Sequence, residues 1–206
     1  MLREVAARFA RAELRAIVAT MGVPGFIVVS GLPASGKTAI GRRIAERLGV
    51  PMLDKDDFLE ARFEEHSSIG PDLRTRLSRQ SDEEFADAAA ALEGAVLVSF
   101  WRPRGQSVSY GTATEWIDRL SGPVVELHCQ CDPNTARERF EARTRHPGHN
   151  DASRRGDLGR QLEEIAALGP LGAWPCVTVE TSDLSDIENL AAKAARDVQT
   201  ALASAP

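Results

Sequence analysis

The sequence predicts a three-layer α/β/α fold built on a doubly wound parallel sheet of about five strands. Short apolar segments alternate with segments of helical periodicity along most of the chain. The apolar segments are continuous rather than alternating, which is typical of strands covered on both faces. The first of them runs directly into a glycine-rich loop and then into an amphipathic helix. In such folds ligands bind at the carboxyl ends of the strands.

Five segments are expected to form strands, at residues 26–29, 52–53, 95–100, 124–129 and 177–181. The first, Phe26-Ile27-Val28-Val29, is mostly β-branched and should be a central strand. A helix marked by Ile40, Ile44 and Leu48 should follow it and end at Gly49. Further helices are expected near residues 58–63, 82–92, 112–120, 133–145, 154–168 and 184–202. Helical spacing also predicts a leading amphipathic helix within residues 1–22.

Composition and charge narrow the class of protein. A chain of 206 residues that is 43% hydrophobic can form one core, so a single domain over residues 1–206 is expected. The formal charge of -5 argues against a nucleic-acid or anionic membrane partner, because such partners require a basic surface. Three cysteines make no disulfide framework. No apolar run approaches the ~20 residues that span a bilayer. We therefore expect a cytoplasmic monomer or homodimer.

The strongest functional signal is the loop after the first strand. It reads Gly31-Leu32-Pro33-Ala34-Ser35-Gly36-Lys37-Thr38 and satisfies G-x-x-x-x-G-K-[ST] between a strand and a helix. Its glycines permit positive φ, so backbone N–H groups can converge on phosphate oxygens at a helix N-terminus. Lys37 is expected to face solvent as a mobile charge for the outer phosphates, and Thr38 to coordinate Mg²⁺. The alternative is an ordinary Gly-Pro turn before a helix.

Carboxylates follow the second expected strand, in the segment Asp54-Lys55-Asp56-Asp57. They should face the same cleft as the loop, because both lie at the carboxyl edge of the sheet. A hydroxyl that attacks a γ-phosphate needs a carboxylate to orient it and accept its proton, and Mg²⁺ needs hard oxygen ligands. Asp54 and Asp56 can divide these roles. Alternatively, Asp56 or Asp57 only caps the helix that follows.

The loop and the carboxylates together resemble a known group. Gly31 to Thr38, followed by a strand ending in Asp54-Lys55-Asp56, is similar to the P-loop small-molecule kinases of the shikimate kinase, gluconate kinase and chloramphenicol phosphotransferase type. The resemblance covers most of the chain after residue 24. It implies ATP and Mg²⁺ as cofactors, Asp54 on the metal side and Asp56 as the base. Zeta-toxin-like and polynucleotide-kinase-like proteins share much of this pattern.

The third expected strand departs from many P-loop proteins. Ala95 to Val98 leads into Ser99-Phe100-Trp101, so no carboxylate stands where a Walker B Asp is common. This leaves the second anchor of the metal open, although in the resembled kinases the Asp at the end of the second strand can serve instead. Arg102 follows at the same edge and is a candidate acceptor contact, because a guanidinium suits carboxylate or phosphate groups. The alternative for Arg102 is a solvated surface side chain.

A lid is expected at about residues 139–155. Arg139 and Arg143 are four residues apart on one helical face and can close over the phosphates. The resembled kinases keep lid arginines here, which supports these two and leaves Arg145 open. Alternatively, the helix arginines pair with Glu138 or Glu141 on a solvated face. The segment has almost no apolar residue to bury, so it should be mobile without ligand.

The sequence thus predicts an ATP- and Mg²⁺-dependent phosphotransferase that moves the γ-phosphate to a hydroxyl of a small molecule. Ser182, after the last strand, is a candidate adenine contact or an N-cap. ATP is preferred over GTP because no guanine-reading N-K-x-D sequence occurs. The alternatives are a nucleotide or nucleic-acid-end kinase, which the acidity disfavours, and a slow ATPase switch or binding module.

Overall fold

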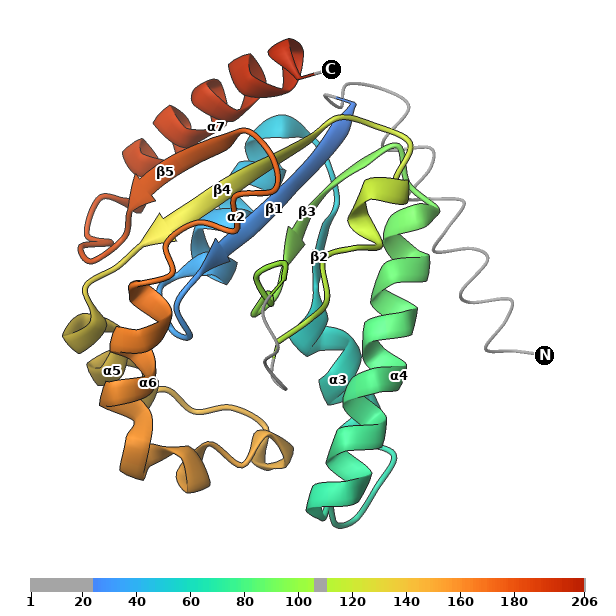
Figure 1. The fold of residues 1–206 in the computed structure, drawn as a ribbon, viewed down its shortest axis with the longest axis vertical. Helices are drawn as coiled ribbons and strands as arrows, with labels where there is room; N and C mark the ends of the chain where they lie inside the picture. Colours follow the sequence, from blue (N-terminus) through green and yellow to red (C-terminus); the bar gives the residue numbers. More distant parts are fainter. Residues whose placement is uncertain (1–23, 106–110, 206) are drawn as a thin grey trace.

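The computed structural model describes residues 24–105 and 111–205, without the side chains of residues 153–155. The expected leading helix of residues 1–22 lies outside this range. Five strands form one parallel sheet in the order β2-β3-β1-β4-β5 (Figure 1). Their bounds are Gly25–Gly31 for β1, Met52–Asp54 for β2, Gly94–Val98 for β3, Val124–Gln130 for β4 and Cys176–Glu180 for β5. The predicted doubly wound α/β fold is confirmed.

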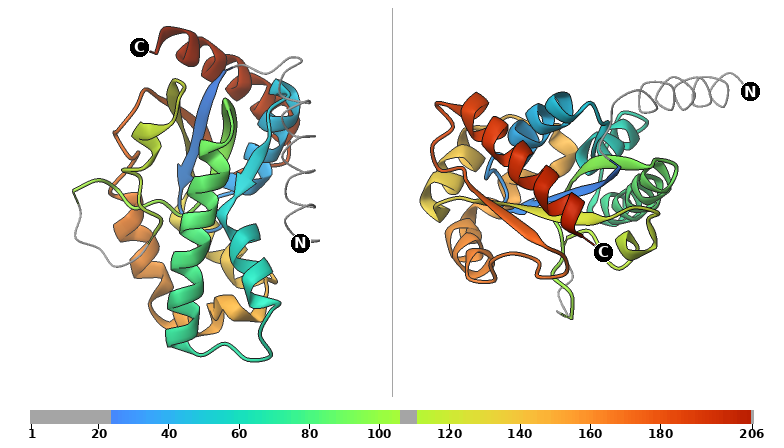
Figure 2. Two further views of the ribbon diagram at one scale, coloured as in Figure 1. Left: turned by 90° about the vertical axis from the view of Figure 1, so that its right-hand side faces the viewer. Right: turned by 90° about the horizontal axis from the view of Figure 1, so that it is seen from above.

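Helices cover both faces of the sheet, as the continuous apolar strands require. Ile27 and Val29 of β1 face the helices α2 (Lys37–Leu48) and α7 (Ile187–Ser204). Phe26 and Val28 face the opposite way, toward Phe85 of α4 (Pro71–Ala90) and Ile117 of the short 3₁₀ helix η1 (Ile117–Arg119). Figure 2 shows these layers from two further sides. β1 is therefore buried on both faces, and the loop that follows it is rigidly placed.

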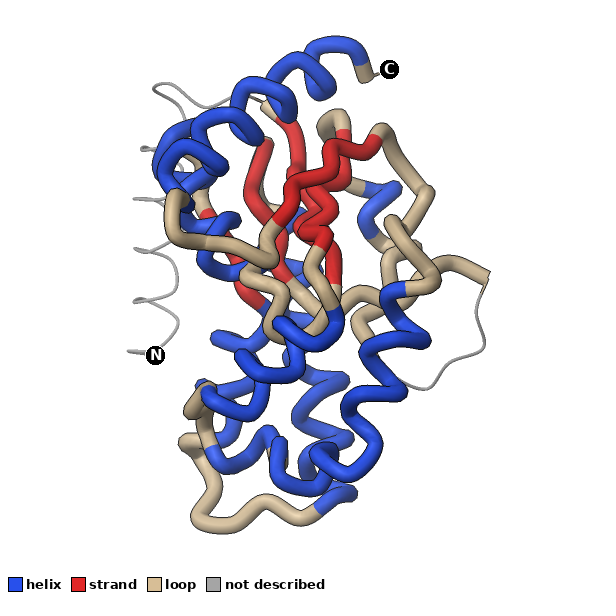
Figure 3. Tube along the Cα trace, turned by 90° about the vertical axis from the view of Figure 1, so that its left-hand side faces the viewer, coloured by secondary structure: helices blue, strands red, loops and turns tan. Residues whose placement is uncertain are grey.

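The remaining helices gather beyond the carboxyl ends of the strands. They are α3 (Lys55–Phe63), α5 (Pro133–Ala142), α6 (Leu158–Ala166) and the 3₁₀ segments η2 (Pro147–His149) and η3 (Asp151–Asp157). Figure 3 shows the strands in the upper half of the molecule and these helices below them. This arrangement builds the candidate site around the carboxyl edge of the sheet.

The structure differs from the expectation at the end of β3 and in the segment that follows it. β3 ends at Val98, whereas a strand over residues 95–100 was expected, and no α-helix spans residues 112–120. The N–H of Thr112 donates to the Phe100 carbonyl, and its own carbonyl accepts from the N–H of Arg102. These long-range backbone bonds replace the helical ones, and only the 3₁₀ turn η1 remains of the expected helix.

Several helix bounds also differ from the prediction. α4 begins at Pro71 rather than near residue 82, because its buried side chains recur every four residues from Leu77 through Ser81, Phe85 and Ala89. The expected helix over 133–145 is α5, which ends at Ala142, and that over 154–168 is α6, which is preceded by η3. None of the helices within the described residues is long and apolar enough to cross a membrane.

Candidate active site

The loop between β1 and α2 has the backbone that its glycines predict. Gly31 and Gly36 have φ of 128° and 93°, in the left-handed region that favours glycine. A Cβ on Gly36 would lie 2.9 Å from Cδ1 of Leu184, so a side chain there would also collide. The Ser35 hydroxyl is buried and has no hydrogen-bond partner within the described part of the chain. An unpaired donor in a glycine-built cradle fits a phosphate group as ligand.

Lys37 is buried in the loop, so the expectation that it faces solvent is wrong. Its side chain is 9% exposed, and Nζ donates to the carbonyl oxygens of Gly31 at 3.1 Å and Leu32 at 2.6 Å. Burial lowers the pKa of Lys37 to about 8. These carbonyls hold the ammonium inside the cradle, where a phosphate oxygen can replace them.

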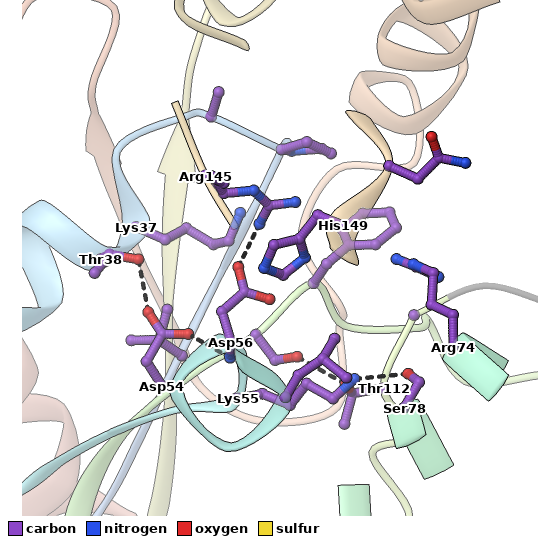
Figure 4. Close-up of a pocket in the computed structure, with 18 of the residues that line it drawn as sticks. Lys37, Thr38, Asp54, Lys55, Asp56, Arg74, Ser78, Thr112, Arg145 and His149 are labelled. Carbon is purple, nitrogen blue, oxygen red and sulfur yellow. Dashed lines mark hydrogen bonds and ion pairs between the residues drawn. The ribbon is translucent and has the colours of Figure 1, made fainter. Parts of the chain in front are cut away.

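Thr38, Asp54 and Asp56 form one chain of contacts beside the loop (Figure 4). Oγ1 of Thr38 donates to Oδ2 of Asp54 at 2.8 Å, and Oδ1 of Asp54 accepts the backbone N–H of Asp56 at 3.0 Å. Asp54 is therefore the N-cap of α3, and it also faces the phosphate loop. Burial raises the pKa of Asp54 to about 6.

Thr38 and Asp54 are suited to hold Mg²⁺, because a hydroxyl and a carboxylate oxygen lie together beside the phosphate cradle. Among the described residues, no group of three or more His, Cys, Asp or Glu side chains could hold a metal ion. Most of the ligands of an Mg²⁺ at this place would thus be water and nucleotide oxygens, as is usual for this ion.

The carboxylate of Asp56 meets an arginine from the other side of the cleft. Nη1 of Arg145 donates to Oδ2 of Asp56 at 2.5 Å, and Arg145 also pairs with Asp151. Arg143 donates to the same Asp151 at 3.1 Å and lies over the ring of Phe140. Sequence reasoning left Arg145 open, yet it is the arginine that contacts the predicted base.

Arg139 and Ser182 come together at the loop between β5 and α7. The guanidinium of Arg139 donates to the carbonyl oxygens of Thr181 at 2.7 Å and Ser182 at 2.6 Å. The hydroxyl of Ser182 accepts from the N–H of Asp132, the N-cap of α5. Arg139 thus anchors this loop to α5 in the structure. Ser182 does not cap α7, because that helix begins at Ile187.

The cleft continues past Asp56 as a cavity of about 1410 Å³ between the phosphate loop, α3, α4 and the end of β3. Arg102 lines it as expected; its Nη2 donates to the Gly111 carbonyl, and its Nε is buried without a partner among the described residues. Five further side chains line it, namely Lys55, Arg74, Ser78, Thr112 and His149, and sequence reasoning missed the first four. Figure 4 shows these five around one opening with Asp56.

A pattern on α4 could have revealed part of this set. Arg74, Ser78 and Asp82 recur every four residues and so share one face of a helix. The polar face is recognised only once α4 is known to begin at Pro71. Nζ of Lys55 donates to Oγ of Ser78 at 2.8 Å, which joins α3 to this face.

The turn η2 is docked on α3 and α4. Gly148 and His149 are buried, and a Cβ on Gly148 would lie 2.5 Å from Cδ2 of Phe63. Nε of Arg74 donates to the carbonyl of Gly148 at 3.2 Å. The premise that the expected lid has almost nothing to bury is therefore wrong, although its mobility stays a prediction.

Comparisons with known proteins agree with this geometry. The family described as an AAA domain matches residues 26–168. A shikimate kinase from Moorella thermoacetica is 29% identical over 187 residues, covering 87% of this chain and 95% of that protein. A shikimate kinase from Paracidovorax citrulli is 40% identical over 57 residues, which is 28% of each chain. The chain thus matches less than a third of that second relative.

A solved structure also has this arrangement. A protein described as a putative kinase from Chloroflexus aurantiacus superposes with a TM-score of 0.71 at 25% identity, covering 87% of this chain and 98% of that one. The predicted P-loop small-molecule kinase resemblance is confirmed.

Proposed function

The chain belongs to the AAA-domain family and has the fold of the P-loop small-molecule kinases, and we propose that it moves the γ-phosphate of ATP to a hydroxyl of a small molecule. The proposal depends most on one observation. Thr38, Asp54 and Asp56 form a continuous chain of contacts between the phosphate loop and the acceptor cavity. These residues bring a candidate metal site and a candidate proton acceptor next to the phosphate loop, and phosphoryl transfer uses both.

Each residue then has a role in binding or orientation. The loop from Gly31 to Thr38 binds the phosphates through its N–H groups and Lys37. Asp54 and Thr38 would hold Mg²⁺, which neutralises charge on the phosphates when it is bound. Asp56 orients the acceptor hydroxyl and accepts its proton.

The arginines complete the site in this proposal. Arg143 and Arg145 stabilise charge that develops on the transferred group. Arg139 fixes the loop that carries Ser182, and so shapes the expected adenine position. Arg102 binds a polar or anionic group of the acceptor, since its Nε has no partner within the described residues.

A screen of ATP consumption against pools of hydroxyl-bearing metabolites tests this function. The purified chain with ATP and Mg²⁺ should turn over far faster with one pool than with none, and mass spectrometry should find that compound phosphorylated. The Asp56→Asn variant is the control, because it keeps the phosphate loop. ATP hydrolysis without any phosphorylated product would instead indicate a slow ATPase switch. Phosphorylation of nucleic-acid ends alone would indicate the other alternative.

A further inference from the structure

His149 places an imidazole in the acceptor cavity beside Asp56. It is 3% exposed and belongs to the turn η2, far from Asp56 in the sequence. Figure 4 shows its ring next to the carboxylate of Asp56. The ring packs edge-on against Phe63, with centroids 5.4 Å apart and an interplanar angle of 80°. The imidazole is therefore fixed in position by packing.

A hydrogen bond to Glu60 determines which nitrogen of His149 carries the proton. Nε2 lies 2.7 Å from Oε1 of Glu60. An ionised carboxylate only accepts hydrogen bonds, so Nε2 of the ring is the donor. In the neutral ring Nδ1 then has a lone pair, and no hydrogen bond to Nδ1 is found among the described residues. The cavity is thus lined by a histidine with an available basic nitrogen.

Burial keeps His149 neutral near pH 7. Burial and the nearby Arg145 lower the pKa of His149, whereas Asp56 and Glu60 of α3 raise it, and the net direction is down. From α4, Arg74 binds the neighbouring carbonyl of Gly148. A neutral imidazole held by a carboxylate is the arrangement in which histidine acts as a base.

We propose that His149, oriented by Glu60, is a second proton acceptor for the acceptor hydroxyl. The inference rests on the proposed function and divides the role assigned there to Asp56, so that Asp56 orients the hydroxyl and His149 accepts its proton. Asp56 has one oxygen held by Arg145 and orients the hydroxyl with the other. As the new O–P bond forms, the bond from the γ-phosphorus to the bridging oxygen breaks and ADP leaves. The O–H bond of the acceptor breaks as well, and its proton passes to Nδ1 of His149. The resulting imidazolium keeps its Nε2–H on Glu60, whose negative charge balances it.

The pH dependence of kcat tests this proposal. The phosphate donor is MgATP, and the attacking group is either water or the acceptor found in the screen. Activity should fall as pH drops through the pKa of His149, below the usual ~6.5 of histidine, because the protonated ring cannot accept. At saturating Mg²⁺, which keeps the carboxylate of Asp54 ionised although burial raises its pKa to about 6, His149→Gln should lose this acid limb and lower kcat by roughly 10²-fold. Glu60→Gln should move the limb to lower pH, because a carboxylate that raises the pKa is gone.

A matched control lies outside the cavity. His66 is exposed and does not line the cavity. His66→Gln should therefore keep kcat and its acid limb. Nitrogen-15 NMR of the four histidines measures the tautomer of His149 without any turnover. A proton on Nδ1, or an acid limb that survives His149→Gln in a folded protein, would overturn the proposal. If no hydroxyl is phosphorylated while the NMR result holds, the proposed function fails instead.

Discussion

Lys37 donates to two carbonyl oxygens of its own loop and is nearly buried. Burial lowers the pKa of Lys37 to about 8. The buried ammonium therefore lowers the free energy of unfolding at neutral pH, where it is charged in both the folded and the unfolded chain. We therefore expect Lys37→Ala to abolish phosphate transfer without lowering the melting temperature. Calorimetry and turnover on the same sample measure both. Near-normal turnover of the variant would contradict the role of the loop.

Asp54 and Asp56 should respond differently to the loss of charge. Asparagine also caps helices, so Asp54→Asn should fold, but it should need more Mg²⁺ for half-maximal rate. Asp56→Asn should keep nucleotide binding while kcat falls by roughly 10²-fold. Titrations of rate against Mg²⁺ and of binding against ATP distinguish the two variants. An unchanged metal requirement for the first and an unchanged rate for the second would disprove this division of roles.

The element whose motion matters most is the segment over residues 139–155. Its turn η2 docks through Gly148, where a Cβ would lie 2.5 Å from the Phe63 ring. Gly148→Ala should undock the turn, speed backbone hydrogen exchange there and lower kcat, because Arg145 and His149 leave the cleft. The segment should also gain protection when an ATP analogue and acceptor bind.

Gly156 provides the control for that experiment. A Cβ on this residue meets nothing within 4 Å, and it lies in η3 of the same segment. Gly156→Ala should therefore leave exchange in η2 unchanged. Exchange that is slow in the free protein and equally slow in Gly148→Ala would mean that the segment is a rigid support with no gating motion.

At the scale of the whole molecule, Glu126 of β4 joins parts of the chain that are distant in sequence. It is fully buried and accepts from Oγ of Ser30 in β1 and from the N–H groups of Leu171 and Gly172. Glu126→Gln leaves at least one of these donors unpaired, so it should lower the free energy of unfolding by about 1–3 kcal/mol. Urea denaturation measures this loss. Glu138 is exposed, so Glu138→Gln should leave the free energy of unfolding unchanged. Equal free energies of unfolding for the two variants would contradict the inference that Glu126 holds these segments together.

What could be predicted about this molecule came from patterns among residues that are close together in the chain. Continuous apolar strands such as Phe26 to Val29 identify the parallel sheet, and the loop from Gly31 to Thr38 is recognisable because its glycines, lysine and threonine are neighbours in the chain. The position of Asp54 and Asp56 at the cleft follows from the rule that parallel strands end at one edge.

Contacts between distant segments were decided only by the tertiary structure. Arg145 and Asp56 are 89 residues apart, as are His149 and Glu60, and no periodic pattern records such a pairing. For the same reason the backbone bonds of Thr112 overrode the helical pattern around it. The sequence by itself determined the sheet, the phosphate loop and the carboxylates, because these depend on neighbours in the chain. Which arginine and which histidine line the cavity depends on how the docked turn packs on Phe63, and packing is a property of the folded molecule alone.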